Sequence, residues 1–311
     1  MKIVCVSSVG TATAVGVINN FRKYDSSIYI VGLDINDYGY TAGSQLVDKY
    51  YQVPYANDDT YIEVVRDILI DENVDLFIPI NDVEIEAVAN NRSIFDDGCQ
   101  MLIPLEQTMS LVQHKYKMNK KASELGLSVP KMDEFDVNVK CIVRDFKGVG
   151  SKGIHFYDSI SEAKVDSTKQ FAQECVMGEE YTVDVLSTRE GCPIFIIPRK
   201  RLEVKSGVAT KVEILNDQKM IKDVKTLIEY LKIPGFANVQ FIKDAAGNNW
   251  FIEVNSRIGG CSNSSLMAAP DMFKCFVDIA NRNEKHIDLN QSVIKWDSIV
   301  TRYYEDILYE K

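Results

Sequence analysis

Two neighbouring segments within residues 236–260 contain the side chains whose types and spacing most clearly indicate a chemical site. The chain reads GFANVQF, then a turn over 245–249, then WFIEVNSRIGG. Side chains repeat every two residues along a strand, so Asn238 and Gln240 would share one face, while Glu253, Asn255 and Arg257 would share a face of the next strand. Oxygen donors suit a hard cation such as Mg²⁺, and an arginine beside them suits a phosphate or carboxylate. The pattern indicates a metal and phosphate site, with an ordinary solvated hairpin face as the alternative.

A glycine-rich loop offers a second candidate for phosphate binding. Gly148, Gly150 and Gly153 form GxGxxG, but the next segment is the strand-like run IHFYD rather than the helix that a dinucleotide-binding loop requires. Strand, glycine loop and strand predict a hairpin tip whose open amides close over phosphates, with Ser151 and Lys152 adding a hydroxyl and a positive charge. A merely flexible turn is the other interpretation.

The elements that position these residues begin with an alternating pattern over the first hundred residues. Apolar runs KIVCVSS, IYIVGLDI, DLFIPI and QMLIP predict strands, and TATAVGVINNFRKY, TYIEVVRDILIDEN and VEIEAVANNRSIF predict helices. This alternation favours a parallel sheet with crossover helices.

Ligands of such sheets bind beyond the carboxyl ends of the strands, which makes three loops candidates for a binding cleft. They are Ser7 to Thr11, with Ser8 and Gly10, then Asp34, and Asn81 to Glu84, with Asp82. Asp34 resembles the acidic residue that contacts a ribose in dinucleotide folds, but the first turn, SSVGTATAVG, lacks the glycine spacing.

The pattern of predicted helices and strands changes after Pro104. QTMSLVQHKYKMNKKASELGLSVP predicts one helical stretch ending near Gly126, and KCIVRDF, GIHFY, FAQECV, EYTVDVLS and PIFIIPRKRL predict the strands of a small antiparallel unit. A helix over KMIKDVKTLIEYLKI, the polar strand pair and a helix starting near Asn263 complete the chain.

Composition excludes several function classes. The 311 residues include 35 basic and 45 acidic side chains, for a net charge of −10, and no basic tract, so nucleic acid is not an expected partner. There is no apolar run of about 18 residues and no signal-peptide pattern, so we expect a cytoplasmic protein without a membrane partner. Seven cysteines without CxxC spacing and three scattered histidines indicate neither a disulfide framework nor a zinc site, and no GxSxG elbow supports a hydrolytic triad.

Together these segments resemble the ATP-grasp superfamily, most closely the carboxyphosphate-forming half of the carbamoyl phosphate synthetase large subunit and small stand-alone carboxylate-amine ligases. The most specific matches are GFANVQF with FIEVNSR, FAQECVMGEEYTVDV and CIVRDFKGVGSKG. The resemblance implies an α/β protein with the α+β ATP-grasp architecture. Its parts would be an N-terminal parallel-sheet pre-ATP-grasp domain (1–105), a helix and antiparallel ATP lid (106–180), and a C-terminal antiparallel-sheet domain with the metal and phosphate site (181–311).

The resemblance also assigns roles by position. Lys115 stands where the family places a basic residue near the nucleotide, and Arg144 where a cation holds phosphate oxygens. The loop of Gly148, Gly150, Ser151, Lys152 and Gly153 would be the flap over the triphosphate. The linker to the adenine edge would be Glu174, Cys175 and Val176, with Glu180 contacting ribose or adenine.

The metal ligands implied by the resemblance are Gln240, Glu253 and Asn255, holding Mg²⁺ or Mn²⁺, and Arg257 matches the residue that steadies the acyl phosphate. Many ligases carry a second carboxylate at position 240, so glutamine there leaves more of the cation's charge to the phosphates. Carbamoyl phosphate synthetase carries the same glutamine, so activity is not excluded. Catalysis would then rest on Arg257, Asn255 and Arg144.

The implied reaction is phosphoryl transfer from ATP to a carboxylate, followed by attack of an amine or other nucleophile on the acyl phosphate. Arg199, Arg201 and Lys211 are candidates for a substrate carboxylate, or else form a solvated basic strand edge. The loop with Ser8, Gly10 and Thr11, facing Asp82 and Glu84, would recognise an amine, unless Glu84 simply occupies the first turn of a helix.

Other functions stay open at this point. They are a kinase-like step that stops at an acyl phosphate or carboxyphosphate, and a nucleotide-binding module without turnover. A nicotinamide-dependent oxidoreductase would rest on the glycine loop alone, whose context contradicts it. Substrates would be a small carboxylate and an amine, and because relatives are commonly dimers, a homodimer is one expected assembly.

Overall fold

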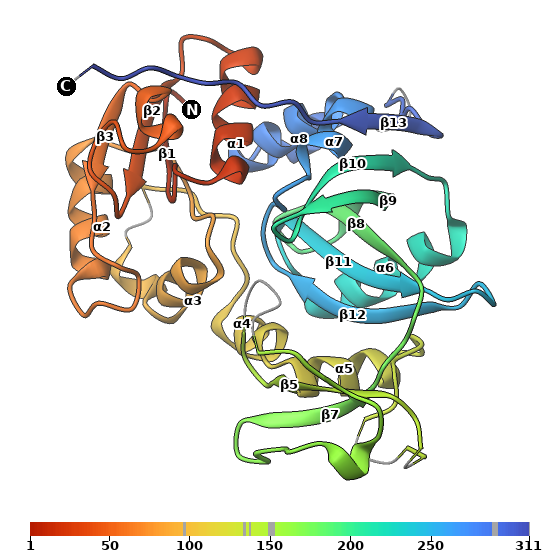
Figure 1. Ribbon diagram of the computed structural model, residues 1–311. Coiled ribbons are helices and arrows are strands. Elements are labelled where there is room, and N and C mark those ends of the chain that lie inside the picture. The colour runs from red at the N-terminus through yellow and green to blue at the C-terminus, as the bar shows by residue number, and fades with distance from the viewer. Residues whose placement is uncertain (96–97, 133–134, 137, 149–152, 288–291, 311) are drawn as a thin grey trace.

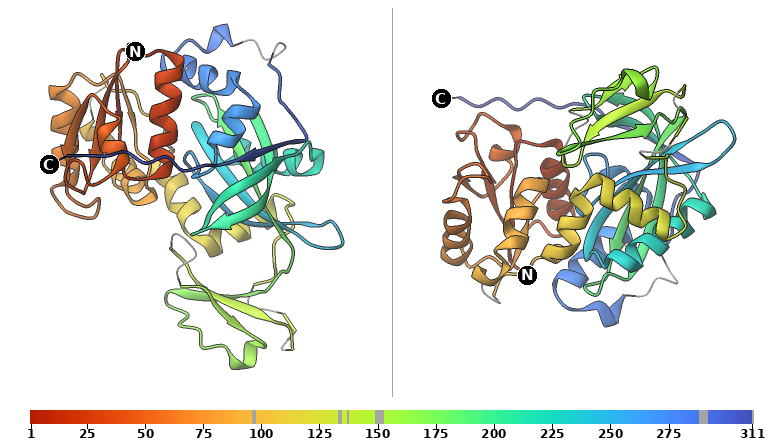
Figure 2. Two further views of the ribbon diagram at one scale, coloured as in Figure 1. Left: turned by 45° about the horizontal axis from the view of Figure 1, so that its top comes forward. Right: turned by 90° about the horizontal axis from the view of Figure 1, so that it is seen from below.

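The computed structural model describes residues 1–95, 98–132, 135–136, 138–148, 153–287 and 292–310. These residues form a mixed α/β protein with a four-stranded parallel sheet, a six-stranded sheet and a three-stranded sheet (Figure 1). The three sheets lie in different parts of the molecule. The three-stranded sheet projects away from the other two (Figure 2).

The N-terminal sheet has the predicted parallel topology. Its strands are β1 (Ile3–Val6), β2 (Tyr29–Asp34), β3 (Lys49–Gln52) and β4 (Leu76–Ile78), in the order β3-β2-β1-β4. The crossover helices are α1 (Ala12–Tyr24), α2 (Tyr61–Asp71) and α3 (Asp82–Asn90). Both faces of the sheet are buried, which explains the nearly continuous apolar runs in the sequence.

One predicted strand of this domain does not form. QMLIP contributes only an isolated bridge, in which Gln100 lies beside Leu76 and its carbonyl accepts the amide of Phe77 at 2.9 Å. Pro104 ends the run, and Arg92 binds the Ile103 carbonyl at 3.2 Å, so the segment leaves the sheet edge after one pairing.

The six-stranded sheet is antiparallel and has the order β12-β11-β8-β9-β10-β13. Its strands are β8 (Glu179–Ser187), β9 (Pro193–Lys205), β10 (Val208–Ile214), β11 (Gly235–Lys243), β12 (Asn249–Asn255) and β13 (Ser298–Thr301). One face packs against α6 (Gln218–Leu231), and the other against α7 (Asn263–Ala268) and α8 (Asp271–Ala280). Helix α1 shares the second of these cores, so the N-terminal domain and this sheet are packed together.

The three-stranded sheet consists of β5 (Cys141–Asp145), β6 (His155–Tyr157) and β7 (Gln170–Glu174), in the order β6-β5-β7. The sequence predicted one antiparallel unit that also included the next two strands. Instead β8 and β9 join the larger sheet, because their apolar side chains on both faces are buried there between two helical layers.

The predicted long helix after residue 106 is two helices, α4 (Glu106–Gln113) and α5 (Lys115–Glu124). His114 separates them with φ −89° and ψ 89°, and its Nδ1 accepts the Lys117 amide at 3.5 Å as a cap. Val112 and Met118 belong to the core of the six-stranded sheet. The domain division expected from the sequence grouped these helices with the lid. In the structure they pack against a face of the six-stranded sheet.

Candidate functional site

A cavity of about 730 Å³ lies where the three parts of the molecule meet. Each part contributes to its walls, because the carboxyl ends of the N-terminal strands, the small sheet and the strand pair β11–β12 all face it. The predicted site residues on its lining are Thr11, Asp82, Lys115, Arg144, Gly148, Glu174, Cys175, Val176, Glu180, Arg199, Arg201, Gln240, Glu253, Asn255 and Arg257.

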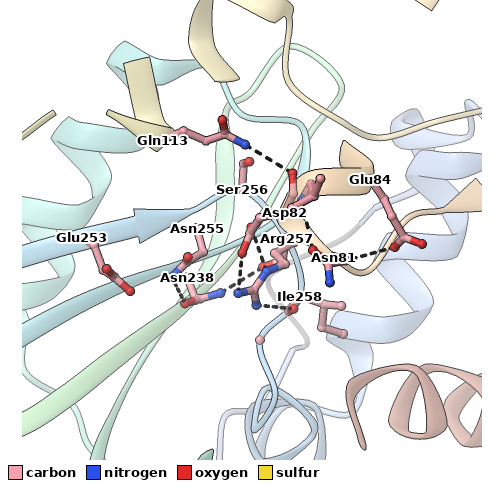
Figure 3. Close-up of polar contacts among 12 residues, drawn as sticks. Asn81, Asp82, Glu84, Gln113, Asn238, Glu253, Asn255, Ser256, Arg257 and Ile258 are labelled. Atoms are coloured by element: carbon pink, nitrogen blue, oxygen red, sulfur yellow. Dashed lines mark hydrogen bonds and ion pairs between the residues drawn. The ribbon is translucent and has the colours of Figure 1, made fainter. Parts of the chain in front are cut away.

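The strand pair places its polar side chains on one wall. Gln240 lies opposite Glu253, and Asn238 lies opposite Asn255, in the antiparallel register of β11 and β12. Asn255 donates through Nδ2 to Asn238 Oδ1 at 3.1 Å, and Asn238 donates to the Arg257 carbonyl at 3.0 Å. Figure 3 shows this chain of amides leading from Asn255 toward Arg257. The amide of Asn255 is thus oriented with its nitrogen toward Asn238.

Two cations converge on the carboxylate of Glu253. Lys115 Nζ lies 2.9 Å and Arg144 Nη2 lies 3.4 Å from Glu253 Oε2. Burial alone would raise the pKa of Glu253, but Lys115 and Arg144 outweigh it, so the pKa lies below its ordinary value. The carboxylate stays charged, and two cations face one anion, which leaves positive charge for an anionic ligand.

Arg144 is held deep in the site, with its side chain 4% exposed. Its Nη1 donates to Gln173 Oε1 at 3.5 Å, and Gln173 in turn donates to Asn119 Oδ1 at 3.2 Å. The buried Nε has no hydrogen-bond partner among the described residues. A buried guanidinium with a donor to spare is a suitable phosphate-binding group.

Arg257 is paired with the N-terminal domain. Its Nε and Nη2 each lie 2.9 Å from a different carboxylate oxygen of Asp82, the first residue of α3 (Figure 3). Gln113 at the end of α4 also donates to the Asp82 carbonyl, at 3.3 Å. Arg257 is therefore oriented before any ligand is bound.

Five of the predicted site residues that the structure describes do not line the cavity. Glu84 is 6% exposed and closes a capping box with Asn81, while Ser7 and Ser8 donate to its Oε2 at 2.6 and 2.9 Å. Glu84 lies in the first turn of α3, the alternative position considered from the sequence, and its carboxylate also holds the loop with Ser7 and Ser8. The others are Ser8, Gly10, Gly153 and Lys211.

Local contacts explain three of those positions. Gly10 donates its amide to Asp34 at 2.7 Å, and a Cβ there would lie 2.8 Å from Thr41, so this turn is tightly packed. Gly153 has φ +75° and lies against Asp145. Lys211 lies 3.7 Å from Glu203, on the half-exposed surface of β10.

The part of the cavity wall next to the small sheet contains the predicted linker and one end of the glycine loop. Glu174 is the last residue of β7, Cys175 and Val176 follow it, and Gly148 comes after β5; all four lie on the cavity wall. Glu180 forms an ion pair with Arg201 at 2.6 Å, so these two predicted residues neutralise each other. Gly150, Ser151 and Lys152 lie outside the described residues.

The donor set suits a hard cation. Among the residues that the structure describes, no three His, Cys, Asp or Glu side chains gather into a metal site, so a cation would depend on the amide oxygens of Gln240 and Asn255 beside Glu253. One carboxylate and two amide oxygens match the few protein ligands that Mg²⁺ takes when phosphates supply the rest.

Sequence reasoning gave no role to several residues that shape the site. Asp184 and Gln173 are buried polar side chains within apolar strand runs, and this isolation was the available signal. Asn238 was placed on the strand face of the expected metal and phosphate site, but without a specific role. Ser262 and Ser265 follow the polar strand pair, and nothing in their own sequence context marks them.

The family model described as "ATP-grasp domain" matches residues 112–261, and that described as "PylC-like, N-terminal domain" matches residues 4–102. No curated protein matches the chain in sequence. None of the described helices is long and apolar enough to cross a membrane.

Several solved structures share the fold. The biotin carboxylase domain of Hydrogenobacter thermophilus 2-oxoglutarate carboxylase, described as a dimer with MgADP and bicarbonate, has a TM-score of 0.74 at 16% identity, over 94% of this chain and 72% of that one. An L-amino acid ligase from Bacillus licheniformis has a TM-score of 0.72 at 16% identity, over 94% and 76%. The ADP complex of an N5-carboxyaminoimidazole ribonucleotide synthetase has 0.68 at 15% identity, over 90% and 76%.

These likenesses establish a fold used by ATP-dependent ligases, and the two family models together span most of the sequence. The chain belongs to the ATP-grasp superfamily, with a PylC-like N-terminal domain.

Proposed function

We propose that this protein is an ATP- and Mg²⁺-dependent ligase that activates a carboxylate as an acyl phosphate for attack by an amine. The observation that carries the proposal is the cluster of Lys115, Arg144 and Glu253 on the wall of a cavity that Arg257 also lines. Two cations around one carboxylate would neutralise transferring phosphates, and phosphoryl transfer depends on such positioning rather than on a protein nucleophile.

Each group would have a defined task. Arg144 and Lys115 would bind phosphate oxygens, and Arg257, oriented by Asp82, would hold the oxygens of the acyl phosphate. Gln240, Glu253 and Asn255 would hold Mg²⁺, which supplies further charge neutralisation when bound. Glu174, Cys175 and Val176 would line the adenine.

The size and shape of the site support a reaction between two small molecules. A cavity of about 730 Å³ falls in the range of ligand pockets that enclose most of a small ligand. Its walls beyond Arg257 come from the N-terminal domain, with Thr11 and Asp82, and from β9, with Arg199 and Arg201. A carboxylate and an amine would meet there, next to the phosphates.

The test is a screen of carboxylate and amine pairs with ATP and Mg²⁺, read as phosphate release and followed by mass spectrometry of the products. A condensed product accompanied by ADP supports the ligase. An acyl phosphate, detected directly or as its hydroxamate after added hydroxylamine traps it, without a condensed product would replace the ligase with the kinase-like activity. Absence of all turnover across the screen would favour a binding module.

A further inference from the structure

Arg199 on β9 is a buried arginine with one edge of its guanidinium occupied. Its side chain is 4% exposed, and it lines the cavity. Nε donates to Asp184 Oδ2 at 2.7 Å, and Nη2 donates to Asp184 Oδ1 at 3.4 Å. The structure records no hydrogen bond from Nη1 to any described residue. One edge of the guanidinium is therefore held, and the other is available to a ligand.

The partner carboxylate is itself fixed from a second element. Asp184 is 1% exposed, and it accepts the hydroxyls of Ser262 and Ser265 at 2.6 Å each. Ser262 also accepts the Gly259 amide at 2.7 Å, which ties the turn after β12 to the same carboxylate. Because the two serine hydroxyls also donate hydrogen bonds to Asp184, its negative charge neutralises Arg199 less completely.

A buried ion pair of this kind is not explained by stability alone. Removing two charges from water costs free energy, and apolar residues of similar volume would stabilise a core at least as well. What the pair does provide is a cation of fixed orientation at the cavity wall. The flat guanidinium edge matches the two oxygens of a carboxylate.

The surroundings also favour an anion. Gly260 and Cys261 line the cavity with Arg199, and a Cβ at Gly260 would lie 3.6 Å from Thr13 Oγ1. Thr13 belongs to the first turn of α1, a helix of 13 residues whose N-terminus carries partial positive charge. Arg199 pairs with Asp184, whereas Lys115 and Arg144 pair with Glu253.

We propose that Arg199 is the cation of a subsite for a carboxylate other than the one that is activated, and that Asp184, Ser262 and Ser265 position it. The substrate class that fits is an amino acid or a dicarboxylic acid. The proposal rests on the ligase function proposed above, because it identifies Arg199 with the substrate end of the same cavity.

Carboxylic acids and their amides provide the test, since each pair differs by one negative charge. Thermal unfolding is measured with L-alanine and L-alaninamide, L-lysine and L-lysinamide, and succinate and succinamate, each with and without adenylyl imidodiphosphate and Mg²⁺. At least one acid is expected to raise the Tm of the wild-type protein by about 2 °C or more, and its amide to leave the Tm unchanged.

Matched variants test whether Arg199 is responsible for the rise in Tm that the acid causes. Arg199→Met is expected to abolish the shift caused by the acid and to keep the shift caused by the nucleotide. Because this change leaves Asp184 buried without its cation, Asp184→Asn with Arg199→Met is made as well, and the same loss is expected. Lys200→Met is the control, since Lys200 pairs with Glu179 at 2.6 Å, does not line the cavity and removes the same charge one residue along β9.

The outcomes separate the two proposals. Acid shifts that persist in both Arg199 variants, amides as effective as acids, or no acid effect in the wild-type protein would each overturn the subsite. A missing nucleotide shift in the wild-type protein would instead count against the ligase function, while the acid series without nucleotide still decides on Arg199.

Discussion

Asp82 and Arg257 form a two-bond ion pair between the N-terminal domain and the turn after β12, with both N–O distances at 2.9 Å. The residues are 175 positions apart in the chain. Arg257 is the residue that we propose to hold the acyl phosphate, so the N-terminal domain takes part in the site by orienting it.

Asp82→Asn tests this coupling. The side chains of Arg257 and Asp82 are 23% and 14% exposed, so losing the charge should lower the free energy of unfolding by about 1–2 kcal/mol, less than for a fully buried pair. We expect kcat for product formation to fall more than the KM for ATP changes, because the nucleotide end keeps its contacts. Denaturant unfolding and steady-state kinetics measure the two effects.

Glu86→Gln is the control for that variant. Glu86 lies on the same helix and pairs with Lys147, whose side chain is 58% exposed. Its substitution should change both stability and kcat little. Equal effects of the two substitutions would show that Asp82 has no special role toward Arg257.

Glu253→Gln should lower ADP formation by about 100-fold or more, since it removes the carboxylate that would face the cation and that holds Lys115 and Arg144. The fold should persist, because glutamine keeps the size of the side chain. Circular dichroism and ADP formation are compared with Glu229→Gln, a surface residue paired with Lys225. Unchanged turnover in Glu253→Gln would remove Glu253 from the metal site.

Nucleotide preference can be measured without knowing the substrates. ATP with Mg²⁺ should raise the Tm, by the equivalent of about 2.7 kcal/mol at one hundred times Kd, whereas NAD should not. Arg144→Met should reduce the shift, because the buried guanidinium would no longer contact phosphates, and Lys169→Met, on the surface and paired with Asp166, serves as its control. Stabilisation by NAD and not by ATP would instead support an oxidoreductase.

Much of the site could be predicted from the sequence because strand geometry is local. The two-residue repeat places Gln240, Glu253 and Asn255 on shared faces, and the short turn between the strands makes them neighbours. The parallel sheet followed equally from the alternation of apolar runs and helices. These features depend on residues close together in the chain.

What could not be predicted depends on contacts between distant segments. Nothing near Asp82 indicates Arg257, and nothing near Asp184 indicates that Ser262 and Ser265, on another element, would donate to it. Glu84 is the opposite case, in which the sequence suggested a role that contacts with distant residues contradict. Its type and position suited an amine site, but the hydroxyls of two serines far away in the chain occupy it.

Glu84 also yields a prediction on pH. Burial raises its pKa above the ordinary value, and the hydrogen bonds from Ser7, Asn81, Ser8 and Tyr61 lower it only in part. A carboxyl whose pKa is higher in the folded state binds its proton more tightly there. Its contribution to stability is therefore fully present below the pKa of the unfolded chain and is lost as the pH rises through the folded pKa.

The comparison that isolates this contribution is with Glu84→Gln, which does not titrate. The free energy of unfolding of the wild-type protein minus that of the variant should increase as the pH falls from 7 to 5, by about 1.4 kcal/mol for each unit by which the two pKa values differ, if titration is complete. Urea denaturation at several pH values measures it, with Glu86→Gln on the same helix as the comparison variant. A difference that stays constant or decreases toward pH 5 would mean that Glu84 is held as a stable carboxylate, so that the serine hydroxyls outweigh the cost of its burial.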